Sequence, residues 1–423
     1  MNAPQYPQQY GWQQPYYPPP KPKKTGLIVL LVCTVLILVA GGITAAVLIT
    51  KSKSEPGPAQ IADAGPPDAN VLKQRLADET VSYGATPVLD ACTVMPADVL
   101  VAAGFGSTAS DWITQTYLPA SVARENATVK GDLDGISHCF YSDARDDHLD
   151  RISLSIDQTP FNRLLGDHPI GDEIEGTSAG LKTFSDSEKS GDYDTRILFP
   201  DGRTEADLRA SNLGDIAGID TKAAFTKLVD AVAGNLAKRP GGHTVYEFSG
   251  RYQGVPLACD LLSGDLFERL AGAPDSGVVE FESNVRELKW KAATNESMVY
   301  GVRQTCRRKS TELISSVGLK GNGLDVEFET FRDEDNATRA FSDCDPNSPQ
   351  RKAVGTPMQV EKVGDGDACA VEIGSPNLIF RMNRTVVRLV GHGEWSPKDL
   401  TSYAKKFTPV AKTMADHLKQ KIK

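Results

Sequence analysis

Six of the seven cysteines lie after residue 90, and their spacing is regular. Cys92 and Cys139 are 47 residues apart, and Cys259 and Cys306 are also 47 residues apart. Thiols at fixed spacing can form disulfides or bind a metal ion. The chain has no Cys-x-x-Cys motif and its six histidines are scattered, which favours disulfides over metal ligation. The expected pairs are Cys92–Cys139, Cys259–Cys306 and, by remainder, Cys344–Cys369.

One serine lies in a sequence similar to the nucleophile elbow of hydrolases. Gly176-Thr-Ser178-Ala-Gly180 matches the Gly-x-Ser-x-Gly pattern, which requires a strand before the serine and a helix after it. The flanking residues Gly171-Asp-Glu-Ile-Glu175 and Leu181–Ser185 fit neither element. We therefore interpret the motif as a loop and predict no catalytic residue.

Two further motifs partly resemble a cofactor site and a metal site. Gly104-Phe-Gly106-Ser-Thr-Ala109 partly matches a dinucleotide-binding loop, but it follows a helical pattern, so Gly104 is expected to end a helix. An acidic cluster follows Cys139, and calcium is the cation that it would suit. Its members are Asp143, Asp146, Asp147, His148 and Asp150. They lack an ordered ligand spacing, so we expect a solvated turn and predict neither a metal nor a cofactor.

The charge distribution argues against a nucleic-acid-binding surface. The chain has 423 residues and a formal net charge of −9, with 55 Asp and Glu against 46 Lys and Arg. All of the acids lie after residue 50, as do all of the bases except Lys21, Lys23 and Lys24. Surfaces that bind nucleic acid or anionic lipid carry an excess of bases. We therefore expect no nucleic-acid partner for residues 51–423.

Residues 26–50 form a long apolar segment without a charged residue. As a helix this segment would be about 37 Å long, enough to cross a hydrocarbon core of about 30 Å. A cleaved signal peptide would have a shorter apolar region, and Val32 is too bulky to precede a lipidated Cys33. We assign a transmembrane helix to residues 25–50. The lysines before it and the cysteines after it predict a single-pass protein of the cell membrane, with a cytoplasmic N-terminus and extracytoplasmic C-terminal domains.

The segments on either side of the predicted membrane helix are expected to be flexible. Residues 1–24 are mostly Pro, Gln and Tyr, a composition typical of disordered or polyproline II tails. Residues 51–79 contain four prolines among Gly, Ala and Ser. We assign the first segment to a cytoplasmic tail and the second to a linker.

The rest of the chain is predicted to be a tandem repeat. The two cysteine pairs are offset by 167 residues, and the sequences after the leading cysteines agree at the same offset. Cys92-Thr-Val-Met-Pro-Ala-Asp98 aligns with Cys259-Asp-Leu-Leu-Ser-Gly-Asp265. Pro96, Ser263 and the two aspartates suit the start of a helix. Each copy is therefore expected to open with a cysteine and a short helix.

Each copy is also expected to close with an amphipathic helix. The first spans residues 220–239, and Asp220 is a suitable N-cap. Its apolar stripe is Phe225, Leu228, Val232 and Leu236. At an offset of 182 residues the stripe recurs as Phe407, Val410, Met414 and Leu418. The larger offset means that the second copy has about 15 extra residues, which can house Cys344 and Cys369.

Strands are predicted between these helices. Alternating apolar residues indicate strands at 151–156 and 325–331. Later strands are expected at 196–199, 377–382 and 385–390, the last two joined by an Asn383-Arg384 turn. The predicted fold class is α+β, with two tandem domains, each a mostly antiparallel sheet with packed helices, after one transmembrane helix. We place copy 1 at residues 80–240 and copy 2 at residues 243–423.

The two openings resemble the start of an uncharacterised actinobacterial extracytoplasmic domain. That domain begins with Asp-Pro-Cys, an apolar pair and a Thr-Pro-Ala-Asp-like helix start, and it occurs in lipoproteins and in the outer sensor modules of membrane kinases. Leu89-Asp-Ala-Cys92 and Leu257-Ala-Cys259 carry the resemblance here, over about 12 residues per copy. Ala91 replaces the family's proline, and a membrane segment replaces its lipidated cysteine. The resemblance implies an envelope location and brings no catalytic residues.

The sequence favours a non-enzymatic function. The duplication retains cysteines, a helix start and an apolar stripe, but His138 and His148 have no counterpart near Cys306. We predict a membrane-anchored extracytoplasmic binding or interaction protein of the cell envelope, whose partner is an envelope protein or a lipid or peptide ligand. A cell-envelope hydrolase whose site forms only in the fold is one alternative. A structural assembly factor is the other.

Overall fold

The fold is known from a computed structural model of the whole chain. It describes residues 65–77, 82–83, 86–105, 112–117, 137–145, 148–158, 174–185, 192–200, 202, 204–211, 219–238, 241–291, 298–310, 322–345, 357–364, 366, 368–393 and 395–421. The chain divides into two compact units, residues 1–65 and 66–423. The predicted tail at 1–24 and the predicted transmembrane helix at 25–50 lie outside the described residues. Within the described ranges, no helix is both long and apolar enough to span a membrane.

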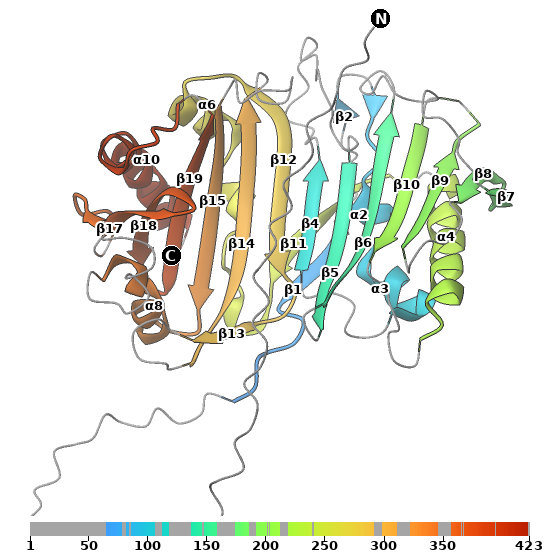
Figure 1. Cartoon of the computed structure of the whole chain (residues 1–423), viewed down its shortest axis with the longest axis horizontal. Helices are drawn as coiled ribbons and strands as arrows, with labels where there is room; N and C mark the ends of the chain where they lie inside the picture. The colour runs from blue at the N-terminus through green and yellow to red at the C-terminus, as the bar shows by residue number, and fades with distance from the viewer. Residues whose placement is uncertain are drawn as a thin grey trace, which may run out of the picture. The chain divides into compact units, whose positions relative to one another are not determined.

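Residues 66–423 are built around one sheet of fifteen strands, each antiparallel to its neighbours (Figure 1). The copy 1 strands are β4 (Trp112–Tyr117), β5 (Ser137–Arg145), β6 (His148–Gln158), β7 (Ile174–Ser178), β8 (Leu181–Ser185), β9 (Tyr193–Leu198) and β10 (Thr204–Ser211). The copy 2 strands are β12 (Asp275–Asn284), β13 (Leu288–Lys291), β14 (Met298–Ser310), β15 (Asn322–Phe331), β16 (Met358–Gln359), β17 (Ala368–Ile373), β18 (Ser375–Met382) and β19 (Thr385–Gly393). β13 pairs beside β14, and the other strands form one continuous row.

The strand order is the same in both copies when it is followed outward from the centre. It is β4-β5-β6-β10-β9-β8-β7 in copy 1 and β12-β14-β15-β19-β18-β17-β16 in copy 2, with β4 paired to β12. Gln115 pairs with Cys139, and Phe281 pairs with Cys306, so Gln115 and Phe281 are equivalent. These two residues also pair with each other. Equivalent strands that pair in opposite directions relate the copies by an approximate two-fold axis.

Most of the helices pack on the sheet face that carries Cys139 and Cys306, whereas α8 (Glu334–Ala340) packs on the opposite face of copy 2. In copy 1 they are α2 (Ala91–Val94), α3 (Ala97–Leu100), the π-helical turn η1 (Val101–Phe105) and α4 (Thr221–Lys238). In copy 2 they are α5 (Ala258–Leu261), α6 (Gly264–Ala271) and α10 (Leu400–Lys421). Asp90 caps α2 by accepting a hydrogen bond from Thr93 N at 2.7 Å, and Ser263 caps α6 by accepting from Leu266 N at 3.2 Å.

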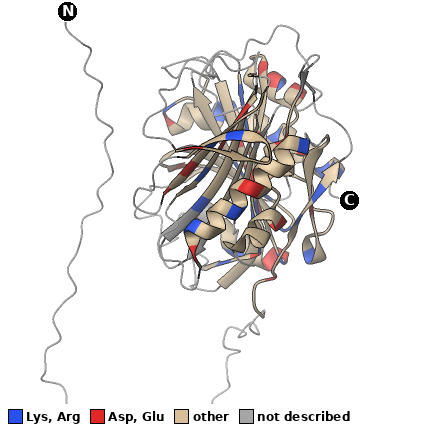
Figure 2. Ribbon diagram, turned by 90° about the vertical axis from the view of Figure 1, so that its right-hand side faces the viewer, with Lys and Arg blue, Asp and Glu red and all other residues tan. Residues whose placement is uncertain are grey.

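The two closing helices have the predicted buried stripes. All eight apolar residues predicted at the 182-residue offset are buried. Asp220 accepts a hydrogen bond from Ala223 N at 2.9 Å, as expected of the N-cap of α4. The opposite side of α4 is exposed and carries Lys222, Lys227 and Asp230, which gives this helix its charged outer surface (Figure 2).

The three disulfides join the cysteines that were paired from their spacing. Cys92–Cys139 attaches α2 to β5, and Cys259–Cys306 attaches α5 to β14. Cys344–Cys369 attaches the 3₁₀ turn η4 (Phe341–Cys344) to β17. Each of the first two therefore fixes the opening helix of a copy to the second strand from the centre.

Part of the predicted linker is folded. β1 (Leu72–Ala77) lies within residues 51–79 and pairs with β11 (His243–Phe248) in a separate two-stranded sheet. A second small pair joins β2 (Ser82–Tyr83) and β3 (Thr86–Pro87). Val71 N also donates to Val285 O at 2.8 Å. Residues 66–77 therefore belong to the folded unit rather than to a spacer.

The predicted fold class is wrong. The described residues are mostly antiparallel strand, and one sheet runs through both copies instead of one sheet in each of two domains. The transmembrane helix included in that prediction is not shown. The prediction missed β4 and β12, the strands that join the copies. An isolated copy would expose an edge strand with unpaired backbone groups, and the other copy supplies the partner for it.

Candidate functional site

Ser178 does not lie in a nucleophile elbow. It ends β7 and begins a two-residue turn to β8, in which Ala179 and Gly180 have φ angles of 49° and 82°. Its Oγ donates to Oδ1 of Asp230 on α4 at 2.7 Å. Positive φ at both central residues is typical of a tight β-hairpin turn, so the serine hydroxyl attaches a hairpin to a helix.

The acidic cluster after Cys139 lies on a hairpin. Asp143 on β5 pairs with Asp150 on β6, and Asp146 and Asp147 lie outside the described residues. Where side chains are described, no group of three or more His, Cys, Asp or Glu is placed to hold a metal ion. Gly104 has a φ of 114° near the end of η1, which agrees with a helix end and not with a phosphate-binding loop.

Other aromatic and histidine side chains that could take part in a site pack or bond within the fold. His138 Nδ1 lies 2.8 Å from Ser155 Oγ on the neighbouring strand. The Trp290 ring packs against Phe331 with centroids 5.3 Å apart. Trp395 Nε1 donates to Gly323 O at 3.0 Å in the core of copy 2. The side chain of Trp112 is outside the described part of the structure.

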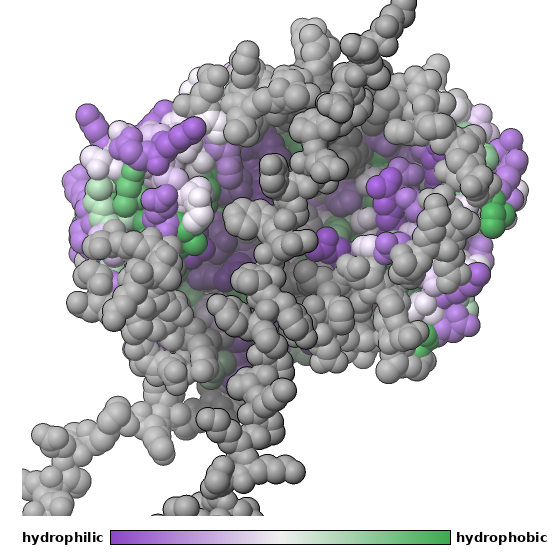
Figure 3. Space-filling view, in the orientation of Figure 1, coloured by the Kyte–Doolittle hydropathy of each residue, from purple (hydrophilic) through white to green (hydrophobic). Residues whose placement is uncertain are grey.

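In copy 2 the second face of the sheet carries a network of ion pairs beside a buried apolar cluster that includes Val299, Phe331 and Cys369. Arg307 contacts Glu280, Glu282 at 2.9 Å and Asp325 at 3.2 Å, and Asp325 lies 3.0 Å from His392 Nε2. Burial lowers the pKa of Arg307, but its attraction to the three acids is stronger and raises the pKa overall. The exposed parts of this face are largely hydrophilic (Figure 3). Neighbouring strands supply the opposite charges, as in ordinary cross-strand pairs.

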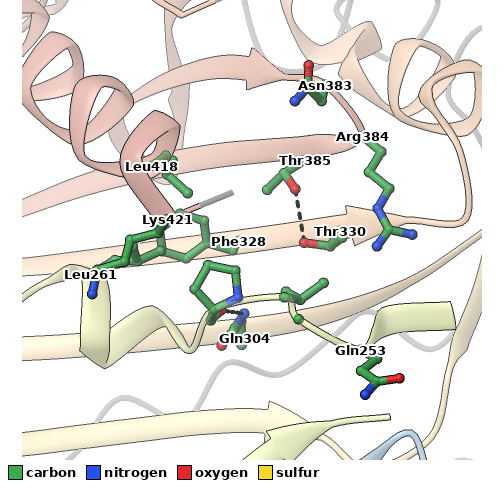
Figure 4. A pocket seen from close by; sticks show the side chains of 13 residues that line it. Gln253, Leu261, Gln304, Phe328, Thr330, Asn383, Arg384, Thr385, Leu418 and Lys421 are labelled. Atoms are coloured by element: carbon green, nitrogen blue, oxygen red, sulfur yellow. Dashed lines mark hydrogen bonds between the residues drawn. The ribbon is translucent and has the colours of Figure 1, made fainter. Parts of the chain in front are cut away.

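A cavity of about 200 Å³ lies in copy 2, on the sheet face covered by helices (Figure 4). It is bounded by the end of α10, the β18–β19 turn and residues 253–256. Leu261, Phe328 and Leu418 give it an apolar lining. The described lining contains no Asp, Glu, His, Ser or Cys. A largely apolar cavity with a few polar groups is typical of a binding site for a small molecule.

Several polar groups in the lining are already satisfied by the protein. Gln304 Oε1 accepts from Ala258 N at 2.8 Å, and Gln304 Nε2 donates to Pro256 O at 2.9 Å. The hydroxyls of Thr330 and Thr385 are 3.1 Å apart and form a buried hydrogen bond. A ligand in the central part of the cavity therefore need not form hydrogen bonds with these groups.

The side chain at the position equivalent to Thr330 is longer in copy 1. Thr330 pairs with Thr385 as Gln158 pairs with Thr204, so Thr330 and Gln158 are equivalent. Gln158 is buried, and its Oε1 accepts a hydrogen bond from Leu89 N at 2.9 Å. At the 167-residue offset Leu89 corresponds to Pro256, which has no N–H to donate. At this place copy 2 therefore has a shorter side chain and no backbone donor, and Gln304, which is equivalent to Ser137, bonds to the Pro256 carbonyl.

Two cations line the cavity on opposite sides (Figure 4). Arg384 comes from the β18–β19 turn, and Lys421 comes from the end of α10. Arg384 Nη1 donates to Arg251 O at 3.0 Å, and its guanidinium lies 5.7 Å from the Tyr252 ring. Among the described residues, these two contacts hold the guanidinium beside the cavity and leave its other N–H groups available.

A buried polar cluster holds the Tyr252 ring that the Arg384 guanidinium contacts. The Tyr252 hydroxyl donates to Glu287, which also accepts from Arg332 Nε at 2.7 Å. The guanidinium of Arg332 lies 4.1 Å from the Tyr300 ring. Burial raises the pKa of Tyr252, and its hydrogen bond to Glu287 raises it further, so the hydroxyl stays protonated at physiological pH. The Tyr252 ring is therefore a fixed surface for Arg384.

A more open groove of about 500 Å³ shares residues 253–256 with the cavity. Its lining mixes both signs of charge, with Lys73, Glu247 and Asp260. Burial raises the pKa of Asp260, and the nearby charge of Lys421 opposes this shift. The groove lacks the single sign of charge that distinguishes the cavity.

The cavity residues were not predicted from the sequence. Asn383 and Arg384 were assigned to a turn, and Asn383 does have the positive φ of 48° that such a turn requires. The turn assignment said nothing of where the Arg384 side chain lies. An alignment of the copies through their strands would have shown Thr330 opposite Gln158 and Pro256 opposite Leu89. No family model, curated protein or solved structure matches this chain.

Proposed function

We propose that this chain is an extracytoplasmic binding protein of the cell envelope and that the cavity in copy 2 holds its ligand. The observation that carries the proposal is the lined cavity in copy 2, where Thr330 and Pro256 stand at the positions of Gln158 and Leu89 in copy 1. The apolar floor and the two cations make that space suitable for a small molecule.

The proposed location is the cell membrane, with the N-terminus in the cytoplasm and residues 66–423 outside. Three disulfides support an oxidising compartment for the folded unit. The resemblance of the cysteine-led openings to an actinobacterial extracytoplasmic domain agrees with this location and stays a prediction.

Binding is favoured over hydrolysis by the composition of the cavity. A hydrolytic site places a nucleophile beside a base, or a metal beside a water molecule. The described lining offers hydroxyls only from Thr330 and Thr385, which bond to each other, and it offers no His, Asp or Glu beside them. The cavity therefore suits a ligand that is held and released unchanged.

The test fills the cavity and asks whether small probes are excluded. Thr330→Met places a longer apolar side chain in the cavity, and Thr413→Met makes the same change on the exposed side of α10. Hexanoate, hexylamine and 1-hexanol are added separately to the full chain and followed by saturation-transfer NMR. We expect at least one probe to receive saturation from the wild type and the Thr413 variant but much less from the Thr330 variant.

Two outcomes would contradict the proposal. One is that none of the three probes receives saturation from the wild-type protein. The other is an equal signal from the wild type and from a Thr330→Met variant whose circular dichroism and melting curve show a folded protein.

A further inference from the structure

We propose that the cavity binds a small organic anion, with its acid group on Arg384 and a short apolar group against Leu261, Phe328 and Leu418. This inference rests on the proposed function, because it names the class of ligand for the same cavity. Three features of the described residues carry it: the available guanidinium of Arg384, the single sign of charge in the lining, and the volume of the cavity.

Arg384 is oriented for an anion but has no anion of its own. Within the part of the chain that the structure describes, its contacts are the carbonyl of Arg251 and the ring of Tyr252. The nearest arginines differ in this respect, because Arg251 pairs with Asp68 at 2.6 Å and Arg332 pairs with Glu287 at 2.5 Å. A guanidinium offers five N–H donors in a planar fork that matches a carboxylate or phosphate.

The charge of the lining favours an acid over a base. Arg384 and Lys421 are the charged residues among those that line the cavity, and both are cations. Asp260 near Lys421 partly offsets the second charge, and Asp260 lines the neighbouring groove rather than the cavity. Arg384 is therefore the stronger site, and Lys421 adds positive potential from the other side.

The volume limits the apolar group to a short one. A cavity of about 200 Å³ has room for about six or seven atoms the size of a water molecule, at about 30 Å³ each. The hydroxyls of Thr330 and Thr385 hydrogen-bond to each other, so the middle of the cavity suits methylene or aromatic carbon. A carboxylate with a chain of about six carbons fits both limits, which makes hexanoate a suitable probe.

The experiment measures affinities of three six-carbon probes for the full chain by isothermal titration calorimetry. Hexanoate, 1-hexanol and hexylamine share the chain and differ in the charge of the head group. We expect hexanoate to bind about tenfold more tightly than 1-hexanol and hexylamine to bind more weakly than either, because only the carboxylate forms a charge-assisted hydrogen bond with the Arg384 guanidinium.

Substitutions of the two cations test whether the carboxylate of hexanoate binds to Arg384. Arg384→Gln is expected to weaken hexanoate about tenfold and to leave 1-hexanol unchanged, whereas Arg384→Lys, which retains the charge, should retain part of the preference. Lys421→Gln is expected to weaken hexanoate about twofold to threefold. Lys405→Gln removes a charge from the exposed side of the same helix and should change neither affinity.

The outcomes separate this inference from the proposed function. If 1-hexanol binds as tightly as hexanoate and Arg384→Gln changes neither affinity, the cavity is a binding site but its ligand is not an anion. If hexylamine binds most tightly, the charge argument is wrong. If Thr330→Met leaves every affinity unchanged, the probes bind elsewhere and both proposals fail.

Discussion

The two copies share a backbone and differ in the side chains that satisfy it. The first N–H of the opening helix is bonded in both copies, by Ser137 Oγ at Ala91 and by Gln304 Oε1 at Ala258, each at 2.8 Å. The carbonyl at the other end is also bonded in both, because Met95 O accepts from Tyr141 and Leu262 O accepts from Arg308. The shared backbone determines which N–H and C=O groups need a hydrogen-bond partner, and a different side chain supplies that partner in each copy.

The buried polar groups of the two copies are correspondingly different. In copy 1, Asp90 accepts a hydrogen bond from Gln115 Nε2 at 2.7 Å, whereas the equivalent residues in copy 2 are Leu257 and Phe281. In copy 2, Arg308 forms a buried pair with Asp275 at 2.6 Å. A duplicated scaffold can thus keep its strand order while the chemistry of its interior differs between the copies.

The largest expected effect tests whether the two scaffolds are equally dependent on their disulfides. Each equivalent bond closes a loop of the same length, so loss of either should lower the free energy of unfolding by about 4 kcal/mol. The variants are Cys92→Ala with Cys139→Ala and Cys259→Ala with Cys306→Ala, compared by urea unfolding of the full chain. A difference of more than about 2 kcal/mol between them would show that the copies are not equivalent in this respect.

The next comparison concerns Arg308 and its equivalent, Tyr141. Asp275→Asn leaves the Arg308 charge buried without a carboxylate, which should lower the free energy of unfolding by about 3 kcal/mol. Tyr141→Phe removes two neutral hydrogen bonds, the one donated to Met95 O and the one accepted from Gln74 Nε2, and should cost about 2 kcal/mol. Urea unfolding near neutral pH measures both. Equal losses would mean that the buried charge in copy 2 is solvated more than its exposure indicates.

A smaller effect depends on pH and distinguishes the polar core of copy 1. Burial raises the pKa of Asp90, although hydrogen bonds from Thr93 oppose the shift. An acid whose pKa is raised by folding stabilises the protein most below its unfolded pKa of about 3.9, and this contribution is lost as the pH rises through its folded pKa. Wild-type stability should therefore show a decline with rising pH that Asp90→Asn removes.

The same substitution should raise the free energy of unfolding at pH 7 by about 1 kcal/mol. Gln115 Oε1 is buried without a hydrogen-bond partner, so a reoriented amide can accept from the new asparagine. Asp98→Asn on the exposed side of α3 is the control and should leave the pH dependence of unfolding unchanged. A wild-type slope that persists in Asp90→Asn would assign it to another group.

The smallest effect is expected when the hydrogen bond between Leu89 N and Gln158 is introduced at the equivalent positions of copy 2. Thr330→Gln alone places an amide where Pro256 has no N–H, and it should destabilise the fold by about 1 kcal/mol. Adding Pro256→Leu supplies that donor and should recover the loss. A double-mutant cycle measured by thermal unfolding should give a coupling energy of about 1 kcal/mol. A coupling near zero would break the proposed equivalence between Thr330 and Gln158.

Features that recur along the chain were predictable. The disulfide pairs, the opening helices and the buried stripes of α4 and α10 follow from comparing the sequence with itself, because equal spacing preserves equal geometry. The strands at 151–156 and 325–331 followed from local alternation, and they lie within β6 and β15. Membrane attachment and envelope location stay predictions.

The contents of each copy could be inferred from the chain alone, because helix caps, apolar periodicity and cysteine spacing are properties of neighbouring or repeated residues. The pairing of β4 with β12 could not, since alternation shows which face of a strand is buried but not which strand lies beside it. The cavity was likewise decided in three dimensions. Its lining comes from residues near 254, 304, 328, 384 and 418, and a volume among such distant segments depends on how they pack, which no local pattern records.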